Sequence, residues 1–111
     1  MLNQIVLVGR LVRDLEVKNL EEGKKVANLT LAVPRSFKNA DGEYETDFIN
    51  CTLWDNIATN TSEYCNKGDI IGIKGRLQTS TIEKENGEKE YKTEVIAEKV
   101  TFLSSRKSED N

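Results

Sequence analysis

The chain has 111 residues, which is enough for one domain with a modest core. Charged residues make up 32% of it and hydrophobic residues 37%, a balance typical of a folded globular domain and not of a disordered one. The formal charge of −3 excludes a protein that is basic overall, so any binding to nucleic acid would depend on the local distribution of cations.

The first half of the chain is predicted to form three strands. Residues 3–12 are an apolar run rich in β-branched residues, with Gly9 permitting a bulge or a close backbone approach. We expect this strand to be buried on both faces, which in so small a domain indicates a covering subunit. A turn-like polar stretch leads to a second strand at 26–33, which Pro34 ends because proline cannot donate to a ladder. The third strand covers 47–54.

The remaining elements are a hairpin turn, a helix and a long hairpin. Residues 39–43 have hairpin-turn chemistry, with Gly42 at positive φ, so the second and third strands should pair. Residues 56–66 have apolar side chains at helical spacing, with Asp55 or Asn56 as the N-cap and Gly68 at the exit.

A fourth strand begins at Ile70, and Gly72 and Gly75 interrupt it where a barrel turns a corner. Residues 78–96 form a long charged hairpin around Asn86-Gly87, and 100–103 close the sheet. This order predicts an all-β OB-fold, a five-stranded barrel with one helix between strands three and four and long β-hairpins. We expect a domain at residues 1–104 and a short flexible tail at 105–111.

The stretch 47–54 has two different faces, because side chains alternate across a strand. One face is apolar, whereas the other has small polar residues with an aromatic ring at each end. Such a face can stack flat rings and hydrogen-bond their edges, and nucleic-acid bases are the commonest such partner. The alternative is that both rings only pack under a loop or a neighbouring subunit. The apolar face consists of Ile49, Cys51 and Leu53, and the mixed face of Phe48, Asn50, Thr52 and Trp54.

Cations lie on or beside the first, second and fourth strands, close to these rings. A positively charged groove with interleaved aromatic rings is typical of sequence-tolerant single-strand binding. The candidates for base stacking are Phe37, Phe48 and Trp54, and those for hydrogen bonds to base or sugar edges are Asn50 and Thr52. The candidate phosphate partners are Arg10, Arg13, Arg35, Lys38, Lys74 and Arg76.

The sequence offers few of the features on which enzymes and metal sites depend. The chain has no histidine, no Gly-rich phosphate loop before the helix, and no serine or cysteine with a base at suitable spacing. We therefore expect no catalytic residue, no metal and no cofactor. Cys51 and Cys65 have no metal-site spacing and there is no secretory signal, so we interpret them as reduced packing residues. No apolar run is long enough to span a membrane, and we expect a cytoplasmic protein.

Six segments in order resemble the bacterial single-stranded DNA-binding protein family, and the likeness runs from about residue 2 to residue 103. The resemblance implies an OB fold, a homotetramer built as a dimer of dimers with strand one in a subunit interface, and single strands wrapped over the outside. It implies a nucleoid-associated protein that coats DNA in replication, repair, recombination or DNA uptake. By position, the family's stacking rings fall on Phe37, Phe48 and Trp54. The segments are Asn3–Leu11, Val26–Val33, Arg35–Phe37, Asp47–Trp54, Tyr64–Gly68 and Gly75–Thr79.

Departures from the family pattern leave a rival open. Ile82 stands where the family has a further stacking ring, and Gln78 and Ser80 stand where it often has basic residues. The chain ends at Asn111 without the family's usual linker and acidic tip, so we do not expect recruitment of replication or repair proteins through such a tip. The rival is an OB-fold interaction module of the primosome accessory type, which the lost cations favour and the three rings oppose. RNA in place of DNA also stays open.

Overall fold

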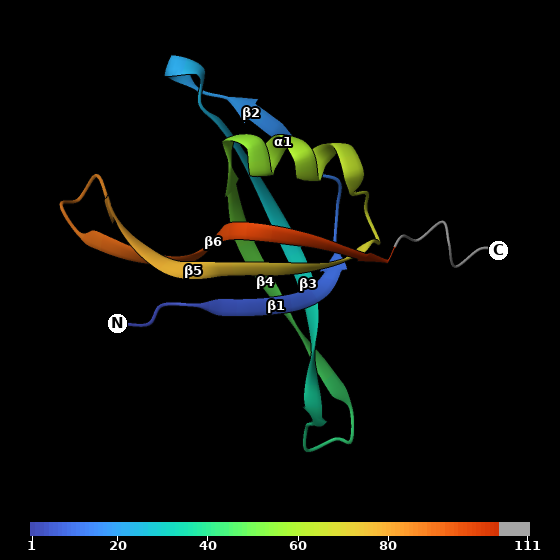
Figure 1. The fold of residues 1–111 in the computed structure, drawn as a ribbon. Helices are drawn as coiled ribbons and strands as arrows, with labels where there is room; N and C mark the ends of the chain where they lie inside the picture. The colour runs from blue at the N-terminus through green and yellow to red at the C-terminus, as the bar shows by residue number, and fades with distance from the viewer. Residues whose placement is uncertain (105–111) are drawn as a thin grey trace.

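The computed structural model describes residues 1–104, in which strands wrap into a barrel with a single helix across one end (Figure 1). The tail expected at 105–111 lies outside the described residues. The strands are β1 (Ile5–Leu11), β2 (Val17–Asn19), β3 (Lys25–Lys38), β4 (Tyr44–Trp54), β5 (Ile70–Glu83) and β6 (Lys89–Ser104), and the helix is α1 (Asp55–Tyr64). A 3-10 turn spans Glu21–Gly23.

Five of these strands close the barrel in the order β1-β5-β6-β4-β3, with β3 returning to β1. All of these pairings are antiparallel except that of β4 with β6, where Cys51 lies opposite Val95 and Thr52 opposite Ile96. With α1 between β4 and β5, this confirms the predicted OB-fold. The turn-like reading of the stretch after β1 was incomplete, because β2 adds a short strand to the edge of β3. Val17 there is half-buried against the core and pairs with Ala27.

The core lies inside the barrel and under α1. Its fully buried members come from every barrel strand, and Ala58 and Thr61 of α1 are buried with them. The predicted packing role of Cys51 and Cys65 is confirmed, since both are free and buried. Burial raises the pKa of each thiol to about 11, with the charge of Asp69 adding to the shift at Cys65. The largest buried side chains are Leu11, Leu31, Leu53, Ile71 and Ile73.

Two glycines stand where backbones approach too closely for a side chain. A Cβ on Gly9 would lie 2.7 Å from the carbonyl oxygen of Ala32, as expected for the bend of β1 across β3. A Cβ on Gly75 would collide with the carbonyl oxygen of Ile96 at the point where the β5–β6 register shifts. The β5–β6 register shifts at Gly75, but β5 does not end there. The strand expected from Ile70 and the first arm of the long hairpin are therefore one continuous strand, β5.

The start of α1 differs from the sequence prediction. Trp54 is the N-cap residue and makes no side-chain capping bond. Asp55 has a positive φ of 52°, and its Oδ1 accepts a hydrogen bond from the backbone N–H of Lys25 at 3.1 Å. The chain turns sharply at Asp55 as it leaves β4. The carboxylate of Asp55 ties the start of the helix to β3. Gly68 lies beyond the helix end with φ +96°, and its N–H donates to Leu11.

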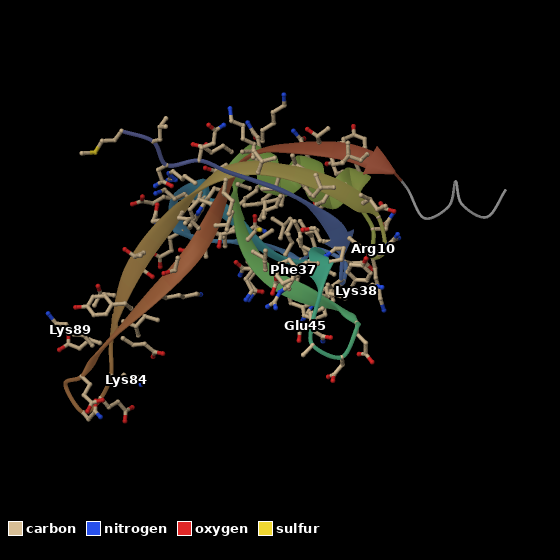
Figure 2. All side chains as sticks on the ribbon, turned by 90° about the horizontal axis from the view of Figure 1, so that it is seen from below. Arg10, Phe37, Lys38, Glu45, Lys84 and Lys89 are labelled. Carbon is tan, nitrogen blue, oxygen red and sulfur yellow. The ribbon has the colours of Figure 1, made fainter. Side chains whose placement is uncertain are left out.

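Two long hairpins extend beyond the barrel and diverge from each other (Figures 1 and 2). The β3–β4 loop has Gly42 at φ +78°, and the β5–β6 loop has Gly87 at φ +84°, so both turn predictions are confirmed. Figure 2 shows Phe37, Lys38 and Glu45 on the first hairpin and Lys84 and Lys89 at the end of the second.

The outer face of β1 is exposed within a single chain. Val6 and Val8 are 67% and 50% exposed, whereas Leu11 on the inner face is buried. The expected burial of β1 on both faces therefore does not arise from this chain's own fold.

Candidate nucleic-acid interface

The outer face of β4 carries exposed rings in a row. Phe48 is 65% exposed and Trp54 is 39% exposed, while Ile49, Cys51 and Leu53 point inward as predicted. Alternation along β4 also brings Tyr44, 59% exposed, onto the face of Phe48. Sequence reasoning missed Tyr44, although the same period of two, followed back to the turn, would have found it. We call the residues Tyr44, Thr46, Phe48, Asn50, Thr52 and Trp54 the β4 outer face.

The charges of β4 are confined to its other face. Glu45 and Asp47 alternate with the outer-face residues and so point away from them. The residues of β3 that lie opposite the β4 outer face, from Val26 to Pro34, are also uncharged. The β3–β4 ladder therefore offers rings and small polar groups without any carboxylate to repel a phosphate.

Hydrogen bonds join the polar groups between the rings into a ladder across three strands. Thr30 Oγ1 donates to Asn50 Oδ1 at 2.8 Å. Thr52 Oγ1 lies 2.7 Å from Glu94 Oε2 and 3.3 Å from Asn28 Oδ1. Although Thr52 belongs to the β4 outer face, its side chain is only 7% exposed, and its hydroxyl joins β4 to β6. Asn50 stays exposed between Phe48 and Trp54.

A hollow of about 360 Å³ opens beside Phe48, at the end of the barrel where β4 and β6 separate. Phe48 and Asn50 line one side, and Leu77 and Val95 line the other. Glu94, which accepts from Thr52, stands at its edge. A flat group stacked on Phe48 would therefore lie over apolar surface with a hydrogen-bonding amide close by.

Arg35 is held by carboxylates of its own hairpin. Its Nε and Nη2 donate to Asp47 at 3.1 and 2.9 Å, and its Nη1 donates to Glu45 Oε2 at 2.6 Å. The hydrogen bond to Asp47 and the attraction of both carboxylates raise the pKa of Arg35, and that bond lowers the pKa of Asp47. Two neighbouring carboxylates therefore already neutralise the charge of Arg35, a phosphate partner predicted from the sequence.

The other predicted cations have different surroundings. Arg10 Nη1 donates to the carbonyl of Gly68 at 2.6 Å and so ties β1 to the turn before β5. Lys38 Nζ lies 5.7 Å from the ring centroid of Tyr44. Arg13 and Lys74 are exposed. Within residues 1–104, Arg76 Nη1 is the one buried side-chain nitrogen or oxygen that has no hydrogen-bond partner.

The remaining predicted ring and the substituted position lie on different hairpins. Phe37 is 65% exposed and falls where the β3–β4 register shifts, between Pro34 and Lys38, so strand alternation alone does not assign it to the β4 outer face. Ile82, 48% exposed, lies opposite Glu90 on the β5–β6 hairpin.

Among the described residues, no three His, Cys, Asp or Glu side chains are grouped so that they could hold a metal ion. No helix in that part of the chain has the length and apolar character to cross a membrane.

Comparison with known proteins gives one consistent result. The model of the Single-strand binding protein family matches residues 2–103. Single-stranded DNA-binding protein B of Bacillus subtilis (strain 168) is 50% identical over 109 residues, which cover 98% of this chain and 96% of that protein. Single-stranded DNA-binding protein 1 of Staphylococcus aureus (strain MSSA476) is 46% identical over 111 residues, covering 100% and 71%. Single-stranded DNA-binding protein 1 of Lactococcus lactis subsp. lactis (strain IL1403) is 47% identical over 109 residues, covering 98% and 73%.

Proposed function

The chain belongs to the single-strand binding protein family, and we propose that it binds and coats single-stranded DNA without regard to sequence. The observation that carries this proposal is the β4 outer face, where exposed rings alternate with small polar groups and every carboxylate of β4 points the other way. The names of the relatives point to the same activity, so the rival protein-interaction module is not favoured. The activity is binding and not catalysis, and it serves replication, repair, recombination or DNA uptake in the cytoplasm.

We assign base stacking to Phe48 and Trp54 on the β4 outer face and to Phe37 on the neighbouring strand. Asn50 is placed between the first two rings to hydrogen-bond a base or sugar edge. Stacking tolerates any base, because every base has a π-face, which accounts for binding without sequence preference.

The phosphate partners we favour are Lys38, Lys74, Arg13 and Arg76. Arg13, Lys38 and Lys74 are exposed and can reach a phosphate, whereas Arg76 would have to turn its buried Nη1, which has no partner in this chain, outward to reach one. Arg35 has a different role, since its bonds to Glu45 and Asp47 stiffen the β3–β4 hairpin. Thr52 likewise supports the sheet through Glu94.

We further propose that the protein assembles as a homotetramer, a dimer of dimers, through the outer face of β1. Val6 and Val8 expose apolar surface there. The surface continues across the sheet, because a Cβ on Gly72 would lie 3.6 Å from Leu103 Cδ1 and 3.8 Å from Val8 Cγ2. A small domain that exposes such a face gains stability when a second copy covers it.

Titration with oligo-dT tests the proposed activity directly, because Trp54 is the only tryptophan and lies on the proposed surface. Its fluorescence should be quenched as bases stack, and the titration should saturate. A duplex of the same length is the control, and an oligo-rU titration shows whether DNA is preferred to RNA. Absence of saturable binding to oligo-dT would refute the proposal.

A further inference from the structure

Tyr44 is an exposed ring that the proposed binding set does not use. It lies at the first residue of β4, 59% exposed, and precedes Phe48 by four residues on the same strand. An even spacing along an uninterrupted strand puts both side chains on one face, and at the usual rise the two rings are separated by roughly 14 Å. The register irregularity of this hairpin falls on β3, between Pro34 and Lys38, and leaves the alternation of β4 intact.

A cation accompanies the ring. Lys38 is paired with Tyr44 across the hairpin, and its Nζ lies 5.7 Å from the ring centroid. A cation over an aromatic ring is held by the negative face of the π-system. Figure 2 shows Lys38 on the β3–β4 hairpin together with Glu45. Glu45 points to the opposite strand face, where Arg35 neutralises it.

The ring and the ammonium group together form the combination that single-stranded nucleic acid needs at one nucleotide. The exposed part of the ring is available to a base, and the ammonium group beside it can neutralise the adjoining phosphate. The carboxylates of β4 itself, Glu45 and Asp47, lie on its other face, and Glu94 of β6, which accepts from Thr52, reaches this face eight residues along β4 from Tyr44.

We propose that Tyr44 is a further base-stacking platform, with Lys38 as the phosphate partner of the same nucleotide, and that it extends the bound strand along β4 beyond Phe48. The proposal rests on the proposed function. It also gives this chain a second platform beside Phe37 on the β3–β4 hairpin, whereas Ile82 offers none on the β5–β6 hairpin.

A fluorescent probe at the position tests stacking itself. In the double variant Trp54→Phe/Tyr44→Trp the only indole is at the proposed platform, and oligo-dT should quench it. The matched control is Trp54→Phe/Tyr91→Trp. Tyr91, on β6, is 73% exposed and pairs with Thr81 of β5. Its side chain therefore lies on the other face of the hairpin from that of Ile82. Quenching at position 44 and not at position 91 supports the proposal, and equal or absent quenching overturns it.

Affinity measurements separate this proposal from the proposed function. Tyr44→Leu should weaken binding of long oligo-dT by about fivefold or more, whereas Tyr44→Phe should bind like the parent, because stacking needs the ring and not the hydroxyl. Short oligonucleotides that reach only from Phe48 to Trp54 should bind both variants equally. Unchanged affinity of Tyr44→Leu for long strands overturns the proposal while parental binding stands. Failure of the parent itself to bind would refute the proposed function.

Discussion

Replacing Phe48 by alanine distinguishes a ring that binds bases from a ring that supports the fold. Truncating a fully buried phenylalanine costs about 3–5 kcal/mol of stability. Phe48 is 65% exposed, so only about a third of that cost applies, roughly 1–2 kcal/mol. The loss of one stacked base should weaken DNA binding by about 1–3 kcal/mol, which is roughly 5- to 150-fold in affinity.

Phe48→Ala is a cleaner test than Trp54→Ala, because Trp54 is only 39% exposed. By the same scaling Trp54→Ala should cost roughly 2–3 kcal/mol of stability, and it removes the fluorescent reporter. In Phe48→Ala the reporter remains, so one oligo-dT titration gives the affinity and thermal unfolding gives the stability.

Phe102→Ala is the matched control. Phe102 is 49% exposed, and its ring contacts Tyr64 at a centroid distance of 5.9 Å, away from the β4 outer face. This variant should lose a comparable amount of stability and keep the parental affinity. If Phe48→Ala lowered the melting temperature strongly while the folded protein bound oligo-dT normally, the stacking assignment would be refuted.

Four further predictions concern assembly, salt, the second hairpin and pH. Light scattering should give four times the 12.5 kDa chain mass, and Val8→Asp should lower it; a parental protein at the monomer mass would contradict the tetramer. Log affinity should fall linearly with log salt, with a shallow slope of about 0.7 per phosphate contacted. Lys74→Gln should make the slope shallower still. An affinity that does not depend on salt would mean that the proposed cations do not contact phosphates. Ile82→Trp should tighten binding of oligo-dT, and no gain would mean that the β5–β6 arm lies off the path of the strand. Because burial raises the pKa of Cys51 and Cys65 to about 11, their contribution to stability is complete below the unfolded thiol pKa of about 8.5 and is lost as the pH rises toward 11. The melting temperature of the parent should therefore fall more over that range than that of Cys51→Ala/Cys65→Ala, and equal decreases would contradict the shift.

Local sequence patterns were enough to predict the turns and strands that depend only on neighbouring residues. The turns at Gly42 and Gly87 follow from residues that accept positive φ, and alternation from Phe48 to Trp54 follows from the strand period. Those two rules were enough to locate the hairpins and the exposed rings of Phe48 and Trp54. The barrel order then followed from the sequence of elements.

What the sequence did not show depends in part on contacts between distant segments. Thr52 is buried because β6 pairs with β4 in parallel and brings Glu94 to its hydroxyl, across 42 positions of sequence. Arg35 meets Glu45 and Asp47 across a hairpin whose register shifts between Pro34 and Lys38. This second contact is local: the register that pairs Pro34 with Thr46 continues to Arg35 and Glu45, and the sequence prediction missed it because it ended the strand at Pro34.

The barrel is joined unevenly, and this has a mechanical consequence. Only two residue pairs connect β1 to β3 and two connect β4 to β6, whereas β5–β6 and β3–β4 are long continuous ladders. The molecule therefore consists of two stiff halves, β2–β3–β4 and β1–β5–β6, that meet at two short seams. Opening a seam would break few backbone hydrogen bonds, but it would expose the core that both halves share, so side-chain packing and not the ladder holds the seams closed. The rings of β4 belong to one half, and Lys74 and Arg76 belong to the other.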